Sequence, residues 1–127
     1  MNRLITLLIT VLGLGFTAFG GWAAFDPASF PAADFPPFNV HLIHDVAATF
    51  AAFGLGLLIA AGRPTWRTPV LTLAALWNGL HLISHIVDVD RAATERAGVS
   101  PIVELAVATA VLALLAWHCR MRGVHRA

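Results

Sequence analysis

The sequence predicts an all-α integral membrane protein, folded as a single domain of four antiparallel helices over residues 1–127. Two observations lead to this prediction. Only 12% of the residues are charged and the mean hydropathy is +0.78, values typical of a chain that lies in lipid rather than in water. Four apolar runs, separated by polar or proline-rich segments, each approach the roughly 20 residues that a helix needs to cross a bilayer.

The four predicted spans cover residues 4–24, 39–61, 68–88 and 100–119. The first link, FDPASFPAADFPPF, holds four prolines in fourteen residues, and Asn39 after it is expected to cap the second span. The second link is GRPTWRTP, and the third is VDRAATERAGVSP, whose Ser-Pro pair is typical of a helix start. Helices are expected because lipid offers no water to satisfy an open strand edge. Short links between them favour an up-down bundle.

Small residues recur at four-residue spacing in the first two spans. Gly13, Thr17 and Gly21 share one helix face, where a neighbouring helix can approach closely. The second span has a similar row, made of Ala48, Ala52, Gly56 and Ala60. We expect both rows to be helix-packing faces. Arg3, the first apolar run and the GGWAA that ends it also have features of a cleavable signal peptide, which would leave three spans, but the run is long for that role.

Arginine predicts the orientation, since the chain has no lysine. One side of the predicted topology carries Arg3, Arg63, Arg67, Arg120, Arg122 and Arg126, whereas the other carries Arg91 and Arg96. The positive-inside rule then places both termini in the cytoplasm, with the chain in the inner (plasma) membrane. The seven acids lie in the outer links or the outer halves of spans: Asp26, Asp34, Asp45, Asp88, Asp90, Glu95 and Glu104. Such carboxylates would attract cations to an outward-facing site.

Ionisable residues inside the spans give the main functional signal. His41 and Asp45 are four residues apart in the second span, so they occupy one helix face. His81 and His85 have the same spacing in the third span, and Glu104 lies about one turn into the fourth. At the usual helix rise, the antiparallel turns bring these residues to similar depths. We therefore expect five groups on three helices to converge in the outer third of the bundle.

This cluster has several interpretations. Imidazole and carboxylate suit zinc, copper, iron or manganese, so the preferred hypothesis is a transition-metal site. One alternative is a b-type haem held by His41 and either His81 or His85. Another is a quinone- or proton-handling site. The cluster can also be purely structural, held by interhelical hydrogen bonds. The pairs would then be His41 with Glu104 and His81 with Asp45.

Three further polar residues are weaker candidates for the same site. Asn78 lies one turn before His81 on the same face, where it can support a ligand through a hydrogen bond. His44 points to another face of its helix than its neighbours in the cluster. Asp88 continues the histidine face at the water interface.

Several other functions lack their sequence signatures. His81 and His85 enclose LIS, so the HExxH motif of zinc proteases is absent, as are the paired ExxH motifs of di-iron bundles. The chain has no P-loop, GxGxxG or GxSxG motif, its single Cys119 forms no CxxC motif, and its basic residues are too few for nucleic acid. The expected partner is the lipid bilayer, with homo-oligomers or a larger membrane complex left open. Whether the protein is an enzyme also stays open.

A family resemblance rests on two stretches, LITVLGLGFTAFGGWAAFDP and NVHLIHDVAATFAAFGLGLLIAA. Together they resemble the DoxX-like proteins, small four-helix proteins of the bacterial inner membrane. In that family a glycine-rich first span ends in a proline-containing loop, and a polar residue opens the second span. The resemblance covers about half of the chain and implies a four-span inner-membrane protein that serves a respiratory or redox enzyme. The histidines do not map onto the family's pattern.

Overall fold

Four long α-helices make up the computed structural model, which describes residues 3–31, 37–92 and 95–124. They are α1 (Arg3–Phe25), α2 (Val40–Gly62), α3 (Pro64–Val87) and α4 (Glu95–Val124), with a short 3-10 helix η2 (Val89–Arg91) after α3. No strand occurs in the described residues. All four helices are long and apolar enough to cross a membrane. The prediction of an all-α, multi-pass membrane protein is thereby confirmed.

The helix bounds agree with the predicted spans most closely in the first half of the chain. α1 and α2 begin and end within one residue of the predicted 4–24 and 39–61. As expected, Asn39 caps α2: its Oδ1 accepts a hydrogen bond from the Leu42 backbone N–H at 3.2 Å. α3 begins earlier than predicted because Pro64 occupies its first position, where the missing N–H costs nothing. The prediction that Ser-Pro begins the last helix was wrong, since Pro101 lies inside α4.

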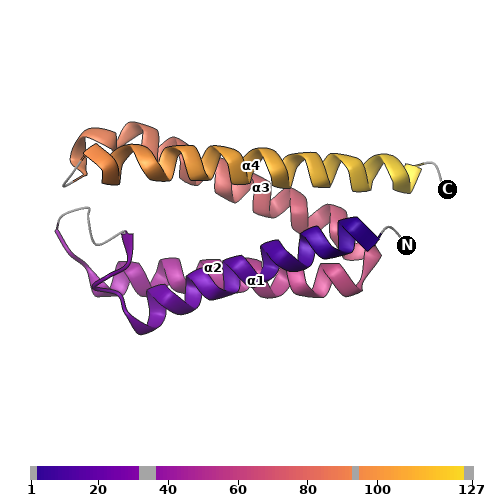
Figure 1. Ribbon diagram of the computed structural model, residues 1–127, viewed down its shortest axis with the longest axis horizontal. Coiled ribbons are helices and arrows are strands. Elements are labelled where there is room, and N and C mark those ends of the chain that lie inside the picture. The colour runs from indigo at the N-terminus through magenta and orange to yellow at the C-terminus, as the bar shows by residue number, and fades with distance from the viewer. Residues whose placement is uncertain (1–2, 32–36, 93–94, 125–127) are drawn as a thin grey trace.

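The helices form two antiparallel pairs. α1 packs along α2 and α3 packs along α4, while α2 and α3 join the pairs less extensively. Figure 1 shows both termini and the α2–α3 connection at one end of the molecule, here called the terminal end. The α1–α2 and α3–α4 connections lie at the opposite end, the loop end. In the same view the two pairs lie close together at the terminal end and farther apart at the loop end.

Glycines let α1 and α2 approach each other closely. A Cβ atom at Gly54 of α2 would fall on Thr17 of α1, and one at Gly20 of α1 would lie only 2.8 Å from the Ala47 carbonyl oxygen. Neither position has room for a methyl group without a shift of backbone. The Thr17 hydroxyl donates to the Gly13 carbonyl oxygen of its own helix at 2.8 Å, so it needs no partner on α2. This interface is therefore specified by side-chain size.

The predicted rows of small residues are correct only in part. Gly13 and Thr17 lie at this interface, but Gly21 faces open space and Gly20 takes its place. In the predicted row of α2, Ala60 is buried and Gly56 is directed at Val70 of α3. Ala48 and Ala52 of that row are exposed. Contact positions advance in mixed steps of three and four residues when helices cross, which a strict spacing of four does not follow.

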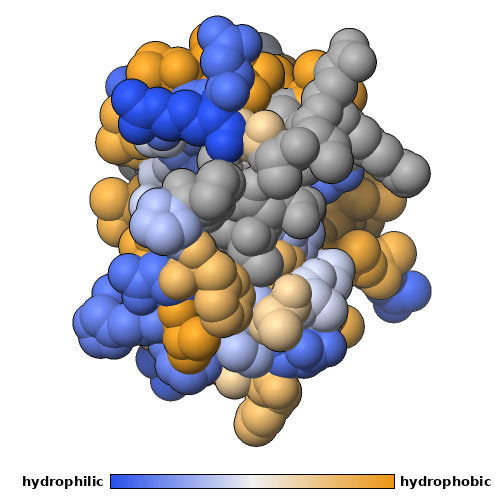
Figure 2. Space-filling view, turned by 90° about the vertical axis from the view of Figure 1, so that its left-hand side faces the viewer, coloured by the Kyte–Doolittle hydropathy of each residue, from blue (hydrophilic) through white to orange (hydrophobic). Residues whose placement is uncertain are grey.

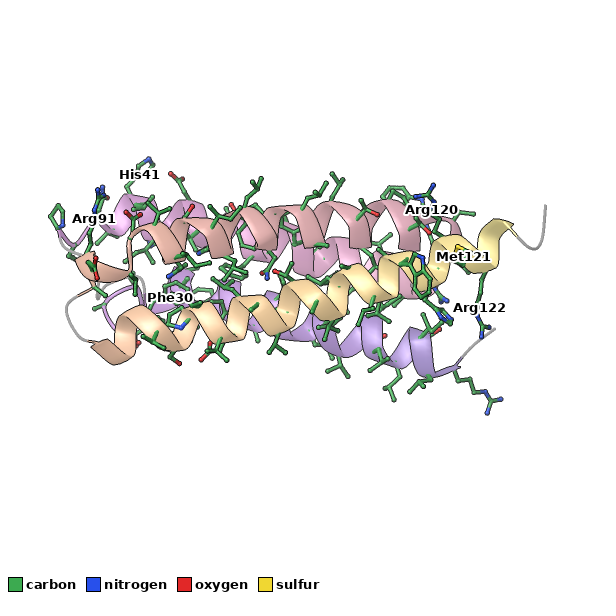
Figure 3. The ribbon with its side chains drawn as sticks, turned by 90° about the horizontal axis from the view of Figure 1, so that it is seen from above. Phe30, His41, Arg91, Arg120, Met121 and Arg122 are labelled. Carbon is green, nitrogen blue, oxygen red and sulfur yellow. The ribbon has the colours of Figure 1, made fainter. Side chains whose placement is uncertain are left out.

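Aromatic rings fill the loop-end half of the first pair. The ring centroids of Phe19 and Phe50 are 4.8 Å apart, and Phe50 continues to Trp77 of α3 at 5.0 Å. Phe30, from the link after α1, is 4% exposed and packs on Phe19 at 4.8 Å. Figure 3 shows Phe30 directed inward among the helices. Phe30 thus packs back onto the bundle, and it borders one side of the space described below.

A buried arginine joins three helices at the terminal end. Arg67 of α3 is 6% exposed, and its Nε donates to the Ala60 carbonyl oxygen at 3.2 Å. Its terminal nitrogen donates to the Ala61 carbonyl oxygen at 2.8 Å and to Thr6 Oγ1 of α1 at 2.9 Å. The last carbonyls of α2 have no intrahelical N–H to accept, and they carry the negative end of the helix dipole. The sequence predicted that Arg67 lies in a loop. Because α3 begins at Pro64, Arg67 lies within this helix and is buried.

Replacing Arg67 by methionine is expected to lower the free energy of unfolding by about 2 kcal/mol, because three hydrogen bonds are lost and two buried carbonyls keep no partner. Thermal unfolding of the detergent-purified protein measures this change. Arg63→Met is the matched control, since Arg63 is exposed just before α3 and its loss is expected to cost under about 0.5 kcal/mol. Equal destabilisation by both variants would contradict the role assigned to Arg67.

Candidate functional site

A pocket of about 680 Å³ lies between the two helix pairs in the loop-end half of the molecule. Its α1 and α2 wall is mainly apolar and includes Phe16, Phe19, Ile43, Val46 and Phe50, with Phe30 from the link. Its α3 and α4 wall carries polar side chains, which are Asn78, His81, Ser84, His85, Asp88, Ser100 and Glu104. Figure 2 looks onto the loop end and shows hydrophilic residues there, bordered by hydrophobic ones. The pocket therefore has two chemically different walls.

Helical periodicity explains why the polar groups gather on one wall. Asn78, His81, His85 and Asp88 follow one another at steps of three or four residues, so they form one stripe along α3 and its C-cap, Asp88. Ser100 and Glu104 have the same relation on α4. Because α3 and α4 pack along each other, their two stripes border the same pocket.

The two histidines of α3 interact directly. Their Nε2 atoms are 3.0 Å apart, and the ring planes differ by only 5° with centroids 4.9 Å apart. The two nitrogens therefore face each other between the rings, and one ring donates while the other accepts. His81 also packs on the indole ring of Trp77, with centroids 5.1 Å apart and planes at 81°. This packing fixes the orientation of the pair.

Asn78 ties α3 to α4 beside the histidines. It is 1% exposed, and its Nδ2 donates to the Leu105 carbonyl oxygen at 3.0 Å and to Thr109 Oγ1 at 2.9 Å. The sequence predicted that Asn78 supports His81 through a hydrogen bond. In the structure its amide nitrogen donates to α4 instead. Asn78 thus holds the polar wall in place through its helix contacts.

Two carboxylates border the pocket, each engaged with a neighbour in sequence. Glu104 Oε1 accepts a hydrogen bond from the Ser100 hydroxyl at 2.9 Å. Asp88 Oδ1 forms an ion pair with the Arg91 guanidinium at 3.1 Å. Both side chains line the same pocket as the histidine pair. They supply negative charge at its edge, and they are two of the seven acids that the sequence analysis expected around the site.

The structure does not bring His41 and Asp45 into this pocket. His41 Nε2 and Asp45 Oδ2 are 3.7 Å apart, and the side chains are 87% and 66% exposed. Figure 3 shows His41 pointing away from the other helices, and His44 is exposed as well. The buried face of α2 passes through Ile43, and a residue two positions away points about 160° from it. Of the five groups predicted to converge, His81, His85 and Glu104 line the pocket, whereas His41 and Asp45 do not.

The pairs predicted for a purely structural cluster also differ from those observed. His81 pairs with His85 rather than with Asp45, and His41 pairs with Asp45 rather than with Glu104. Each observed pair lies within one helix. These pairs therefore do not tie one helix to another, a role that Asn78 and Arg67 fill.

The fit of a metal or haem can be judged from the same geometry. Within residues 3–31, 37–92 and 95–124, no group of three or more His, Cys, Asp or Glu side chains is arranged to hold a metal ion. His81 and His85 offer two convergent nitrogens. The predicted haem, held by His41 and either His81 or His85, would need His41, which lies outside the pocket. Among the described histidines, the two that line the pocket both belong to α3.

The aromatic wall was missed by the sequence analysis. Phe16 and Phe19 are three residues apart in α1, and this spacing was a signal that they share a face. Phe50 recurs on the facing surface of α2 and contacts Phe16 at a centroid distance of 5.5 Å. Phe30 carried no signal, because it lies in a proline-rich link without periodicity.

Comparison with known proteins adds no relative: no family model, no curated protein and no solved structure matches the chain. The resemblance to the DoxX-like proteins therefore stays a prediction, as do the choice of membrane and the side on which the termini lie. The functional argument depends on the pocket itself.

Proposed function

We propose that this membrane protein binds a lipid-soluble molecule with a polar, oxygen-bearing ring, of the quinone class, in the pocket between its helix pairs. The observation that carries the proposal is the pairing of an aromatic wall with a stripe of hydrogen-bonding groups in one space. Its volume of about 680 Å³ suits a small molecule, and ligand pockets are typically apolar with a few placed polar groups.

The helix arrangement supports entry from the bilayer. α1 and α4 border the pocket from opposite pairs, yet they make little direct contact with each other. On the α1 side the lining includes Gly15, where a Cβ atom would meet no other atom within 4 Å. On the α4 side it includes Ala108. These two small residues leave space at which a lipid-soluble molecule would enter between α1 and α4.

The polar wall suits a ring carbonyl or hydroxyl oxygen. The N–H shared by His81 and His85 can turn toward a ligand oxygen, exchanging one hydrogen bond for another. The Ser84 and Ser100 hydroxyl groups on the same wall donate to the Leu80 carbonyl oxygen and to Glu104, and their oxygens can accept from a ligand hydroxyl. Across the pocket, Phe16 and Phe50 present ring faces and edges for stacking. The ring would thus lie between the aromatic wall and the histidine pair.

Filling the pocket should weaken this binding. Gly15→Phe places a ring in the open space of the pocket, and we expect it to weaken binding of a decyl-substituted benzoquinone about tenfold or more. His85→Leu should weaken binding about fivefold through the loss of one hydrogen bond. Quenching of tryptophan fluorescence measures both effects, because Trp77 packs directly on His81.

Gly21→Phe is the matched control for the filled pocket. Gly21 lies on the same helix, has open space around it and does not line the pocket, so its substitution should leave the affinity within about twofold. Quenching that does not saturate, or that is equal in the two glycine variants, would contradict the proposal. Such a result would mean that quinone dissolved in the detergent quenches the tryptophan fluorescence without binding in the pocket.

A transition-metal ion, zinc or copper, is a second candidate for the same pocket. The supporting observation is the 3.0 Å separation of the two histidine Nε2 atoms. Two nitrogens about 2.0–2.1 Å from a tetrahedral ion lie about 3.3 Å from each other, so a small rotation of the rings would let both bind one ion. Water or a ligand oxygen would complete the coordination, because the pocket's carboxylates are engaged elsewhere.

Titration of metal-free protein with zinc or copper tests this candidate. His81→Ala and His85→Ala should each remove a single site of one ion per chain, since either change leaves one protein donor. His41→Ala is the control, because His41 lies outside the pocket and its loss should leave the site intact. No uptake by the wild-type protein, or an equal loss in the His41 variant, would exclude a metal site at the pair.

A further inference from the structure

A second groove runs along the opposite, outward side of α3 and α4. Its volume is about 580 Å³, and its lining extends from Thr68 to Ile83 on α3 and from Thr109 to Arg120 on α4. None of the residues that line it lines the pocket described above. We propose that this groove binds one anionic phospholipid, with the phosphate at Arg120 and an acyl chain along the helices toward Ile83.

The dimensions of the groove suit an acyl chain of one leaflet. Thr68 and Ile83 are fifteen residues apart on a continuous helix, which corresponds to about 22 Å at the usual rise. One leaflet contributes about half of the roughly 30 Å hydrocarbon core. The groove therefore extends from the terminal end past the middle of the membrane, and a chain anchored at that end can lie along it.

Small side chains keep the groove open. Ala75 and Gly79 of α3 and Ala113 of α4 line it. A Cβ atom at Gly79 would meet Thr109 Cγ2 at 3.5 Å, which is ordinary contact. α3 and α4 therefore do not interlock here as α1 and α2 do at Gly54. The space between them remains available to a flexible apolar chain.

Charge selects an anionic headgroup. Arg120 lines the groove at the terminal end, where Arg3, Arg63 and Arg122 also lie among the described residues. A guanidinium group binds phosphate with paired hydrogen bonds. Trp117 lines the groove one turn away, and tryptophan is enriched at the level of the lipid headgroups. The cation and the indole thus mark the headgroup end of the site.

Native mass spectrometry of the detergent-purified full chain tests the headgroup. Phosphatidylglycerol and phosphatidylcholine with identical acyl chains are titrated separately, and the wild-type protein should prefer phosphatidylglycerol about fivefold at its tightest site. Arg120→Gln should abolish this preference. Arg122→Gln carries the same change of charge, but the two side chains point about 160° apart on α4, so it should retain the preference. Figure 3 shows the two arginines on different sides of the helix end.

A third variant tests the groove itself. Gly79→Leu places a side chain in the groove and should weaken binding of both lipids, whereas Gly21→Leu, in open space on α1, should not. A wild-type protein without headgroup preference, or equal effects of the two arginine variants, would overturn the proposal. So would unchanged lipid binding in the Gly79 variant. If the chain forms dimers that added lipid does not dissociate, the groove binds a second copy of the chain, and the lipid proposal is overturned as well.

Discussion

The guanidinium group of Arg67 is the contact on which the arrangement of the helices depends. It satisfies two carbonyl oxygens at the end of α2 and the Thr6 hydroxyl of α1, while belonging to α3. Lipid would leave those carbonyls without partners, so the three helix ends are held together there. With the terminal end fixed in this way, the two pairs separate toward the loop end, as Figure 1 shows.

The separation gives the molecule its pocket, and the composition of each pair gives the pocket its chemistry. α1 and α2 are held together by glycine contacts, which require no polar side chains, so their inner face is free to carry phenylalanine rings. α3 and α4 are joined by the amide of Asn78 and carry the polar stripe. An apolar and a polar wall therefore face each other across one space, a combination that suits an amphipathic ligand.

Length and hydropathy were enough to predict the four helices. They were not enough to predict which way each residue points. His41 and Asp45 lie on the outer face of α2, because Ile43 and Ala47 provide its buried face. In α1, likewise, Gly20 faces α2 and the predicted Gly21 faces open space. Arg67 was predicted to lie in a loop because Pro64 was interpreted as part of the link between helices, whereas Pro64 is the first residue of α3.

A crystal structure of the protein extracted with its native lipids would test the central claim most directly. If the two helix pairs diverge from Arg67, Gly15 of α1 and Ala108 of α4 should remain apart. Non-protein density should then lie between the aromatic wall and the histidine pair. Direct packing of α1 against α4, with Gly15 in contact with Ala108 and His81 and His85 covered by protein side chains, would contradict it.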